Sequence, residues 1–552
     1  MTWLSLPAIT WEWIFIAILS GIAIAARALP RMPWLSNEYC YDSWSSRRYY
    51  VAAAILAGMA LHIAGFLGTF DINDDQHLIA DDLLVIHLSF ANLRALAATD
   101  FHGTFQHLTY VTAALNWALA GERYWLWYLC NWLLLIPILY CVARLSWRLT
   151  GSTTRAALAA VFFAATPVVA ESLCWMNARG QWLGLCFALA SCVIYLEYRW
   201  CAARHKPAWL ALSVGLFALA LLAPPTFIYL PLWLVVFDVW DRRRDWRVLL
   251  AEKAPYFALA TWTAYRLLSS PGTRFAAPPG DSYFHTLLMD ANLLVEYTRT
   301  LLMPVATGLE PPLNVPDGWL SAPGSASILT INFAPLASVI MIAAGGFIVF
   351  VLKRRHGWSL PLLWAAAVFV SLLPAMNIPG HGLAGAFEYR YTLSAHVVSA
   401  ILLADFALRL TRGKQRWGKA ARAVSLGLVL AYLGWAVSVT LSTSVAWRSP
   451  AAYWHRMTEL YPTSYAALYR AGKIAQRASR HAQAVDYLQR ALVVNTGHDF
   501  QVYRRLGESL YFMHDYAGAR KYWRIYYTEN PYEITDKMRR RFRRINLQLP
   551  EE

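Results

Sequence analysis

Charged side chains are scarce in this sequence: aspartate, glutamate, lysine and arginine make up 15% of 552 residues, whereas hydrophobic residues make up 58%. A chain of this length with so little charge is too apolar for a soluble globular protein, and its composition indicates a membrane protein with several spans. Its 26 tryptophans cluster near the ends of apolar runs. Such positions suit amphipathic rings, which favour the headgroup layer of a bilayer.

Cysteine is also sparse, with seven residues, an odd number, and no CxxC spacing. This pattern excludes a disulfide framework and gives no sign of a zinc site, so we expect the cysteines to be packing residues. The sequence contains no Walker loop, no dinucleotide glycine fingerprint and no GxSxG elbow. The first apolar stretch, residues 14–26, lacks a basic leader and follows Glu12, so we expect a retained span rather than a cleaved signal peptide.

The net charge of +16 does not indicate nucleic acid, because the basic residues fall in alternate short loops between apolar runs and at the C-terminus. Loops rich in lysine and arginine usually face the cytoplasm. Apolar runs long enough to cross or nearly cross a bilayer predict twelve spans, at about 8–26, 49–70, 123–143, 155–172, 181–198, 208–223, 226–240, 254–269, 334–352, 358–376, 391–408 and 422–443. Both termini are then expected on the outer face.

The same pattern divides the chain into three parts. Residues 1–48 are expected to hold an extra span and a cytoplasmic loop, residues 49–445 a membrane domain, and residues 446–552 a soluble helical domain. The membrane domain has two long outward loops, 71–122 and 270–333. Each loop contains a stretch with helical periodicity that also holds charged residues. Because a charge at mid-bilayer is costly, we expect both stretches to lie along the membrane interface.

The C-terminal part contains an internal repeat of 35 residues, in which Gly472 recurs as Gly507 and Ala484 as Ala519. A glycine followed twelve residues later by alanine allows paired helices to approach closely, which resembles two tetratricopeptide repeats. An unrelated pair of helical hairpins is the alternative. The basic tail "DKMRRRFRRINL" predicts either a capping helix that meets acidic lipid headgroups or a solvated end.

The stretch "GTFDINDDQHLIADD" places five aspartates directly after an apolar run: Asp71, Asp74, Asp75, Asp81 and Asp82. A carboxylate partly buried at a membrane surface has a raised pKa and is a useful proton acceptor. The alternative is a solvated acidic loop without a chemical role.

Two further polar groups are expected at the outward ends of spans. In "TPVVAESLCWMNAR", Glu171, Trp175 and Arg179 are spaced by four and would share one helical face; a Glu171–Arg179 structural pair is the alternative. In "HGLAGAFEYRYTL", Arg390 offers a planar fork suited to phosphate, or else pairs with Glu388. This second group consists of His381, Glu388, Arg390 and Tyr391. His102 and His107 lack a third ligand, so a metal there is only weakly indicated.

Three of these motifs together resemble the GT-C superfamily of membrane glycosyltransferases, and most closely the transmembrane and tetratricopeptide repeat-containing O-mannosyltransferases. The similarity covers about residues 60–531. "FDINDDQHLI" resembles the first-loop aspartate motif of that family, "FQHLTYVTAALN" its YRPLTVLTFRLN segment, and "TPVVAESLCWMNAR" its HPVHTEAVAWISGR segment. Gln106 and His107 stand where the family has Arg-Pro, and "EYRYTLSA" matches its late motif loosely.

The resemblance implies an all-α, polytopic GT-C fold of about twelve spans with a C-terminal α-solenoid, in the inner membrane of a bacterium, with the catalytic loops and the repeats in the periplasm. It implies an inverting enzyme that moves one sugar from a polyprenyl-phosphate donor to a protein or glycan acceptor held by the repeats. The donor is a substrate; no cofactor is implied, and a divalent metal is left open. Membrane lipids are expected partners and nucleic acid is not.

In that reaction Asp74 would be the general base, and Asp75 would orient the acceptor or Asp74. The donor phosphate and sugar would be bound by residues among Arg390, Arg179, Glu171, His381, Glu388, Tyr391 and His107. Two other functions stay open at this point. One is an oligosaccharyltransferase or ligase that moves a whole lipid-linked glycan, and the other is a non-enzymatic membrane scaffold that carries the repeats.

Overall fold

The computed structural model describes residues 44, 48–69, 82–98, 106–199, 206–241, 246–269, 283–308, 342, 346, 360–376, 389–412, 419–494, 500–530 and 536–547. Within these residues every regular element is a helix, which confirms the all-α class for the described part of the chain. Asp74, Asp75, His381 and Glu388 lie outside the described residues, as do the expected spans at 8–26 and most of 334–352.

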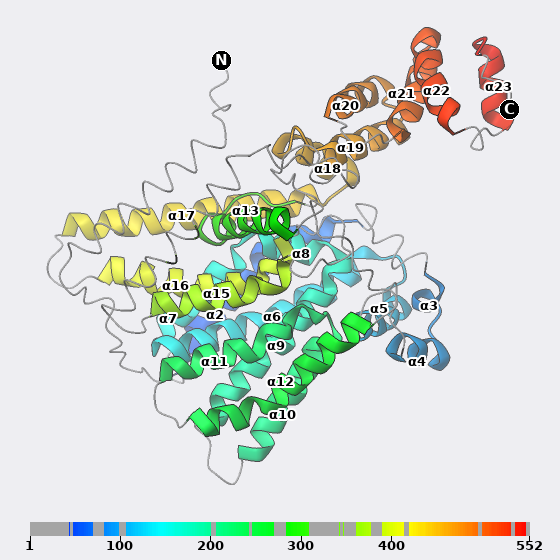
Figure 1. The fold of residues 1–552 in the computed structure, drawn as a ribbon. Helices are drawn as coiled ribbons and strands as arrows, with labels where there is room; N and C mark the ends of the chain where they lie inside the picture. The colour runs from blue at the N-terminus through cyan, green and yellow to red at the C-terminus, as the bar shows by residue number, and fades with distance from the viewer. Residues whose placement is uncertain are drawn as a thin grey trace.

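A large bundle makes up most of the molecule, and a row of shorter helices extends away from it (Figure 1). The bundle contains α2 (Arg48–Leu61), η3 (Ile63–Leu67), α6 (Tyr124–Thr150), α7 (Thr153–Ala164), α8 (Pro167–Cys174), η5 (Met176–Ala178), α9 (Arg179–Tyr198), α10 (Lys206–Leu222), η7 (Pro225–Tyr229), α11 (Leu230–Asp241), α12 (Trp246–Ser269), α15 (Leu360–Leu372), η8 (Leu373–Ala375), η9 (Tyr389–Thr392), α16 (Leu393–Arg412) and α17 (Lys419–Ala446). At its edge lie α3 (Leu83–Ile86), α4 (Phe90–Ala98), α5 (His107–Ala120) and α13 (Tyr283–Leu302).

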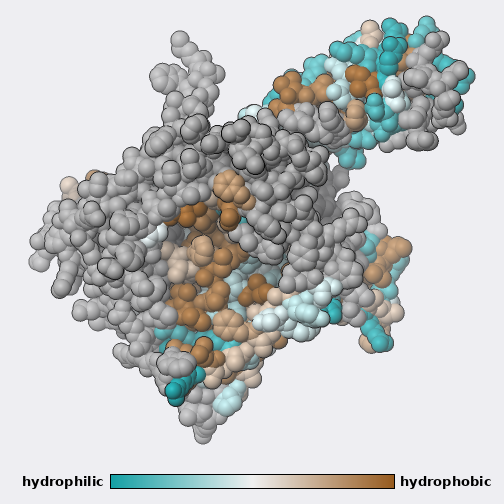
Figure 2. Space-filling view, viewed as in Figure 1, coloured by the Kyte–Doolittle hydropathy of each residue, from teal (hydrophilic) through white to brown (hydrophobic). Residues whose placement is uncertain are grey.

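Among the described residues, five helical segments are long and apolar enough to cross a membrane: Arg48–Leu67, Tyr124–Thr150, Met176–Tyr198, Tyr389–Thr411 and Lys419–Ala446. A sixth span is formed if α7 and α8 are counted together, and three shorter apolar helices accompany them. The molecule is therefore compatible with a membrane protein. Where the visible bundle face is coloured, apolar residues dominate its centre, whereas the C-terminal helices are more polar (Figure 2). On α17, Leu428 is 65% exposed, as expected of a lipid-facing residue.

The predicted span at 155–172 is not one straight helix. α7 and α8 are bent by 57° relative to each other, at a break between Ala164 and Pro167. Pro167 occupies the first turn of α8, where its missing N–H costs nothing, and its ring disfavours a helical conformation for the preceding residue. Broken helices occur at membrane depth where protein or a cavity surrounds them, and all eight residues of α8 are buried.

The first outward loop also differs from the prediction of one amphipathic helix. Two short helices, α3 and α4, form instead, and Asp82 caps α3 by accepting a hydrogen bond from the Leu84 amide at 2.8 Å. Leu83 and Phe90 remain 67% and 83% exposed. In the second loop the predicted helix is present as α13, which buries Leu293, Tyr297 and Asp290.

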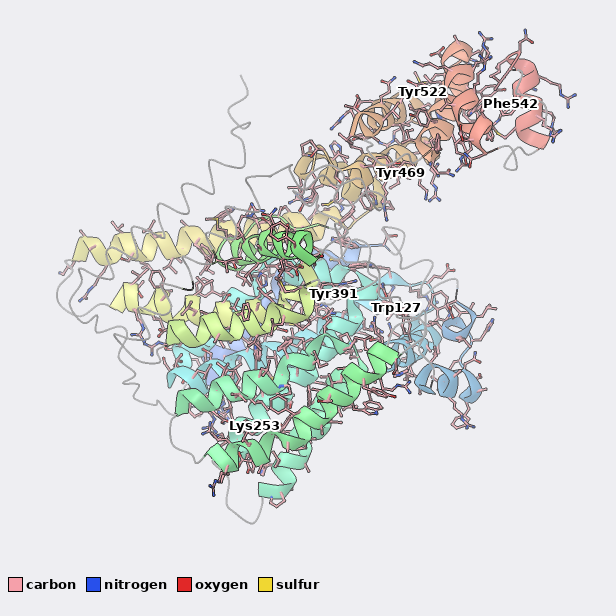
Figure 3. The ribbon with its side chains drawn as sticks, viewed as in Figure 1. Trp127, Lys253, Tyr391, Tyr469, Tyr522 and Phe542 are labelled. Atoms are coloured by element: carbon pink, nitrogen blue, oxygen red, sulfur yellow. The ribbon has the colours of Figure 1, made fainter. Side chains whose placement is uncertain are left out.

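Charged groups gather at one end of the bundle, where α6 and α9 end, which we call the Glu197 end. Glu197 pairs with both Arg144 and Arg148, and Asp238 pairs with Arg199 at 3.0 Å and with Lys253. The opposite end, where α6 begins and α8 ends, is called the Trp175 end. Figure 3 shows Lys253 well separated from Trp127 and Tyr391. The basic residues Arg144, Arg148, Arg199 and Lys253 thus lie at the same end of the bundle.

The C-terminal row begins with α18 (Pro450–Leu460) and continues as two consecutive helical hairpins and a last helix. These are α19 (Tyr465–Arg477) with α20 (His481–Val494), α21 (Gln501–Phe512) with α22 (Tyr516–Glu529), and α23 (Asp536–Arg544). Their geometry repeats after 35 residues. A Cβ on Gly472 would lie 2.7 Å from Leu488 Cγ, and one on Gly507 would lie 2.6 Å from Nε1 of Trp523. The left-handed turn residues Ser479 and His514 also correspond, with φ of 60° and 63°.

We expect Gly507→Ala to destabilise the second hairpin, because the added methyl group would overlap the buried indole of Trp523. Overpacking of this kind costs about 1–3 kcal/mol, which outweighs the gain of up to about 1 kcal/mol in helix propensity. Amide hydrogen exchange of α21 and α22 in the full-length protein measures the effect. Gly434→Ala in α17 is the control, since no atom lies within 4 Å of its added Cβ. Equal protection of α21 in wild type and Gly507→Ala would contradict the packing described here.

Candidate functional site

At the Trp175 end, Arg390 from η9 stacks on an aromatic side chain from α8. Its guanidinium carbon lies 4.0 Å from the centroid of the Trp175 ring and 5.4 Å from that of Tyr391. A cation over a tryptophan face is attracted by the ring quadrupole, and stacking fixes the plane of the guanidinium. Arg390 is partly exposed, whereas Trp175 is 1% exposed. The pair presents an oriented cationic fork at this end of the bundle.

Glu171 also lies on α8, and its carboxylate is buried: the residue is only 1% exposed. Its backbone carbonyl accepts the hydrogen bond from the Trp175 amide at 3.0 Å that ends α8. An ionisable group buried in a membrane domain is costly, and such groups usually mark functional sites. Its location at the Trp175 end is compatible with the predicted role of Glu171 in donor binding, which stays a prediction.

The expectation that Glu171, Trp175 and Arg179 share one helical face is wrong. α8 ends at Cys174, Trp175 is extended with φ −86° and ψ 110°, and η5 separates it from α9. Because the helix is interrupted here, regular spacing in the sequence does not become regular spacing on one helix. Arg179 begins α9 rather than extending α8.

Arg179 is 4% exposed and is held by α5 and α6. Its Nε donates to Asn131 Oδ1 at 3.0 Å and one terminal nitrogen donates to the Trp127 carbonyl at 3.3 Å, while the Trp127 ring lies 4.8 Å from the guanidinium carbon. With its amide turned to face the guanidinium, Asn116 accepts two further bonds at 3.0 and 3.2 Å. These contacts favour a structural role for Arg179, with its donors directed toward protein groups.

A second acidic residue, Glu296 of α13, reaches the same end of the bundle. It accepts a hydrogen bond from the Tyr389 hydroxyl at 3.2 Å and pairs with Arg299, whose Nε lies 2.9 Å from Oε2. Sequence reasoning missed this group, because α13 was interpreted only as an interfacial helix. The signal available was the Glu296–Arg299 spacing of three residues, which places opposite charges side by side on a helix.

The C-terminal domain contributes Tyr461 to this cluster, directly after α18. Its hydroxyl is shielded from solvent. Burial raises the pKa of Tyr461, and the nearby carboxylates of Glu171 and Glu296 raise it further. No sequence feature pointed to Tyr461. The contact joins residues 171, 296, 389 and 461, which are separated by 70 or more positions in the chain.

The two segments that flank the aspartate motif are anchored at the Trp175 end. A Cβ on Gly68 would lie 2.5 Å from Cζ of Tyr124, and the Tyr124 hydroxyl donates to the Cys174 carbonyl at 2.7 Å. After the motif, α3 and α4 pack on α5. The beginning of α5 meets the beginning of α9, since a Cβ on Gly180 would lie 2.7 Å from Thr109 Oγ1. The segment before the aspartate motif thus lies beside the end of α8, and the segment after it packs on α5, whose beginning meets α9.

His107 ties two helices together, and neither it nor any described cysteine belongs to a metal-binding group. His107 is 9% exposed, and its Nδ1 lies 3.2 Å from the Leu96 carbonyl, so it ties α4 to α5. In the part of the chain that the structure describes, no group of three His, Cys, Asp or Glu side chains has an arrangement that could hold a metal ion. Four of the five aspartates in the motif lie outside that part, and the divalent metal stays a prediction.

Comparison of the sequence with models of known protein families, and with curated proteins, found no match.

Proposed function

We propose that this protein is an inverting membrane glycosyltransferase of the GT-C type that moves a single sugar from a polyprenyl-phosphate donor to a protein or glycan acceptor. The observation that carries the proposal is the convergence at the Trp175 end. The stacked Arg390, the buried Glu171 and the segment that leads into the aspartate motif lie there, although they come from separate parts of the chain.

The proposed chemistry needs two kinds of group. The acceptor hydroxyl must lose a proton as it attacks the sugar carbon, and a positioned carboxylate accepts that proton. Asp74 is assigned this role, with Asp75 orienting Asp74 or the acceptor. The bond from the sugar to the donor phosphate breaks at the same time, and the departing phosphate is stabilised by cationic hydrogen-bond donors.

Arg390 is the best candidate for the phosphate, because its guanidinium is oriented by Trp175 and the residue as a whole is partly exposed. Arg179 serves this site indirectly, by holding α9 against α5 and α6. Glu171, Tyr391, His381 and Glu388 are assigned to the donor headgroup or to its supports. A lipid donor explains why such a cluster would lie at one end of a membrane bundle.

We also propose that the chain crosses a bacterial inner membrane twelve times, with the Trp175 end and the C-terminal helices in the periplasm. The two C-terminal hairpins are interpreted as tetratricopeptide repeats that hold the acceptor. Support comes from their 35-residue geometry, in which Gly472 and Gly507 meet Leu488 and Trp523. Stacked repeats of this kind form extended concave surfaces.

Intact mass spectrometry of periplasmic proteins and envelope glycans tests the function, with cells that carry the gene compared with cells that lack it. We expect one or more species to lose the mass of a single sugar residue when the gene is absent. Loss of a larger glycan would instead favour the oligosaccharyltransferase. Identical masses in both strains, with the protein present at a normal level, would contradict a transferase and favour the scaffold.

The proposed orientation predicts that alkaline phosphatase fused after Glu552 is active, because twelve spans return the C-terminus to the outer face. A fusion after Arg244, in an expected cytoplasmic loop, is the matched control and should be inactive. A cytoplasmic fluorescent reporter that matures after Glu552 would overturn this topology.

A further inference from the structure

Helix α23, the last helix of the C-terminal row, carries five arginines among its nine residues. It belongs to a basic part of the chain, since residues 446–552 hold 18 lysines and arginines but only 10 aspartates and glutamates. The resulting net charge of +8 is half of the +16 of the whole chain. Because the charge of a folded domain has little influence on the orientation of membrane spans, this excess needs another explanation.

One side of α23 fixes the helix on the rest of the row. Phe542 is 5% exposed, and its ring centroid lies 5.5 Å from that of Trp523 and 5.1 Å from that of Tyr527. Arg541 pairs with Glu508 of α21 at 3.0 Å. α23 is therefore a packed helix rather than a loose chain end, and its other side is held in a fixed direction.

The other side presents four exposed arginines, which we call the arginine patch: Arg539, Arg540, Arg543 and Arg544. At 3.6 residues per turn they lie within an arc of about 140°. Within the described part of the chain, no hydrogen bond, ion pair or ring contact joins their side chains to another residue. Arg539 and Arg543 are spaced by four, as are Arg540 and Arg544, and like charges at this spacing destabilise a helix. The patch therefore does not stabilise α23, and acidic groups of a partner would relieve its repulsion.

Two features favour a soluble partner over lipid headgroups. A helix that lies in a membrane interface buries its apolar face among the lipids, but the apolar side of α23 is already packed on Trp523 and Tyr527. Figure 1 shows α23 at the end of the row that points away from the bundle, and surface charges are largely screened beyond about 10 Å. The proposed orientation also places the row in the periplasm, apart from nucleic acid.

We propose that the arginine patch is a docking surface for an acidic segment of a partner polypeptide, and that this partner is the acceptor protein. Guanidinium groups suit carboxylates, because each can donate two parallel hydrogen bonds to one carboxylate. Opposite charge also speeds the encounter of the two molecules. The docking rests on the charge and packing of α23, whereas the identity of the partner as the acceptor rests on the proposed function.

Binding of an acidic peptide to the full-length protein in phosphatidylcholine nanodiscs tests the surface. The probe is a short fluorescent peptide of alternating glutamate and serine, with glutamine in place of glutamate as its control, and fluorescence anisotropy measures the affinity. We expect the affinity to fall about ten- to hundredfold in the patch variant, through the loss of several exposed charge pairs. This variant combines Arg539→Gln, Arg540→Gln, Arg543→Gln and Arg544→Gln. Its melting temperature should not fall, because the four side chains have no described partner.

A matched control removes the same charge from other exposed positions of the same domain. It combines Arg448→Gln, Arg477→Gln, Arg480→Gln and Arg490→Gln. We expect its affinity for the acidic peptide to fall less than about threefold, since screening weakens distant charges. Equal losses in the two variants would mean that the net charge of the domain attracts the peptide. That result, or an unchanged affinity in the patch variant, would overturn the proposal.

Vesicles test the lipid alternative directly. Wild-type nanodiscs are mixed with vesicles of phosphatidylglycerol or of phosphatidylcholine, and co-flotation is measured. We expect no more binding to the anionic vesicles than the patch variant shows. Binding to phosphatidylglycerol that is lost in the patch variant, together with no binding of the acidic peptide, would assign the patch to lipid headgroups and overturn the proposal.

Modification of proteins in cells tests whether the partner is the acceptor. At equal protein level, we expect the sugar-modified fraction found by intact mass spectrometry to be lower with the patch variant than with the control variant. If wild-type cells contain no species that depends on the gene, the proposed function fails, while peptide binding still decides the docking surface. An undiminished modified fraction with the patch variant, where the wild type does modify proteins, would show that the acceptor does not use the patch.

Discussion

Replacement of Asp74 by asparagine is expected to slow sugar transfer about a hundred- to ten-thousand-fold, the range for removal of a positioned general base. Asparagine keeps the size and polarity of the side chain but cannot accept the acceptor's proton. Donor affinity and protein level should be nearly unchanged. Single-turnover transfer from a defined polyprenyl-phosphate sugar by purified protein measures the effect. The assignment rests on the resemblance of "FDINDDQHLI" to the family motif and on the position of Gly68, just before the motif, beside the end of α8.

Three neighbouring aspartates are controls for this prediction. A larger defect in Asp75→Asn than in Asp74→Asn would move the base by one position. Asp82→Asn should have little effect, because Asp82 caps α3 and asparagine is an equally good cap. Asp81→Asn should behave similarly. Near wild-type transfer by both Asp74→Asn and Asp75→Asn would contradict the mechanism.

Arg390→Lys is expected to reduce the transfer rate about 10²- to 10³-fold, the usual effect of removing a donor that stabilises developing charge. Lysine retains the charge but loses the planar fork and the stacking on Trp175, where the guanidinium carbon lies 4.0 Å from the ring. Because the substitution should leave the fold unchanged, we expect the melting temperature of Arg390→Lys to stay close to that of wild type. The measurement is the rate constant for transfer at saturating donor.

Arg409→Lys is the matched control for Arg390→Lys. Arg409 lies on α16, at the Glu197 end, and pairs with Asp405 at 2.6 Å. Lysine can preserve this ion pair, and Arg409 is remote from the Trp175 end, so transfer should be nearly normal. An Arg390→Lys protein that transfers sugar as fast as Arg409→Lys would remove Arg390 from the proposed phosphate site.

Sequence periodicity predicted those features that depend on neighbouring residues. Long apolar runs predicted helices such as Tyr124–Thr150 and Lys419–Ala446, because a helix that faces lipid must be apolar along its length. The recurrence of Gly472 as Gly507 predicted the paired C-terminal helices, because close approach of two helices requires a small side chain. Both signals are local, so they can be read without knowledge of the fold.

Tertiary structure alone decided which polar groups meet. The turn after Cys174 separated Glu171 from Arg179, which regular spacing had placed on one face. Arg179 then paired with α5 and α6, and Glu296 joined Tyr389. Tyr461 reached the same cluster from the C-terminal domain. These meetings depend on how helices distant in the chain pack against one another, and packing is set by the shapes of both partners, which the periodicity of either segment does not contain.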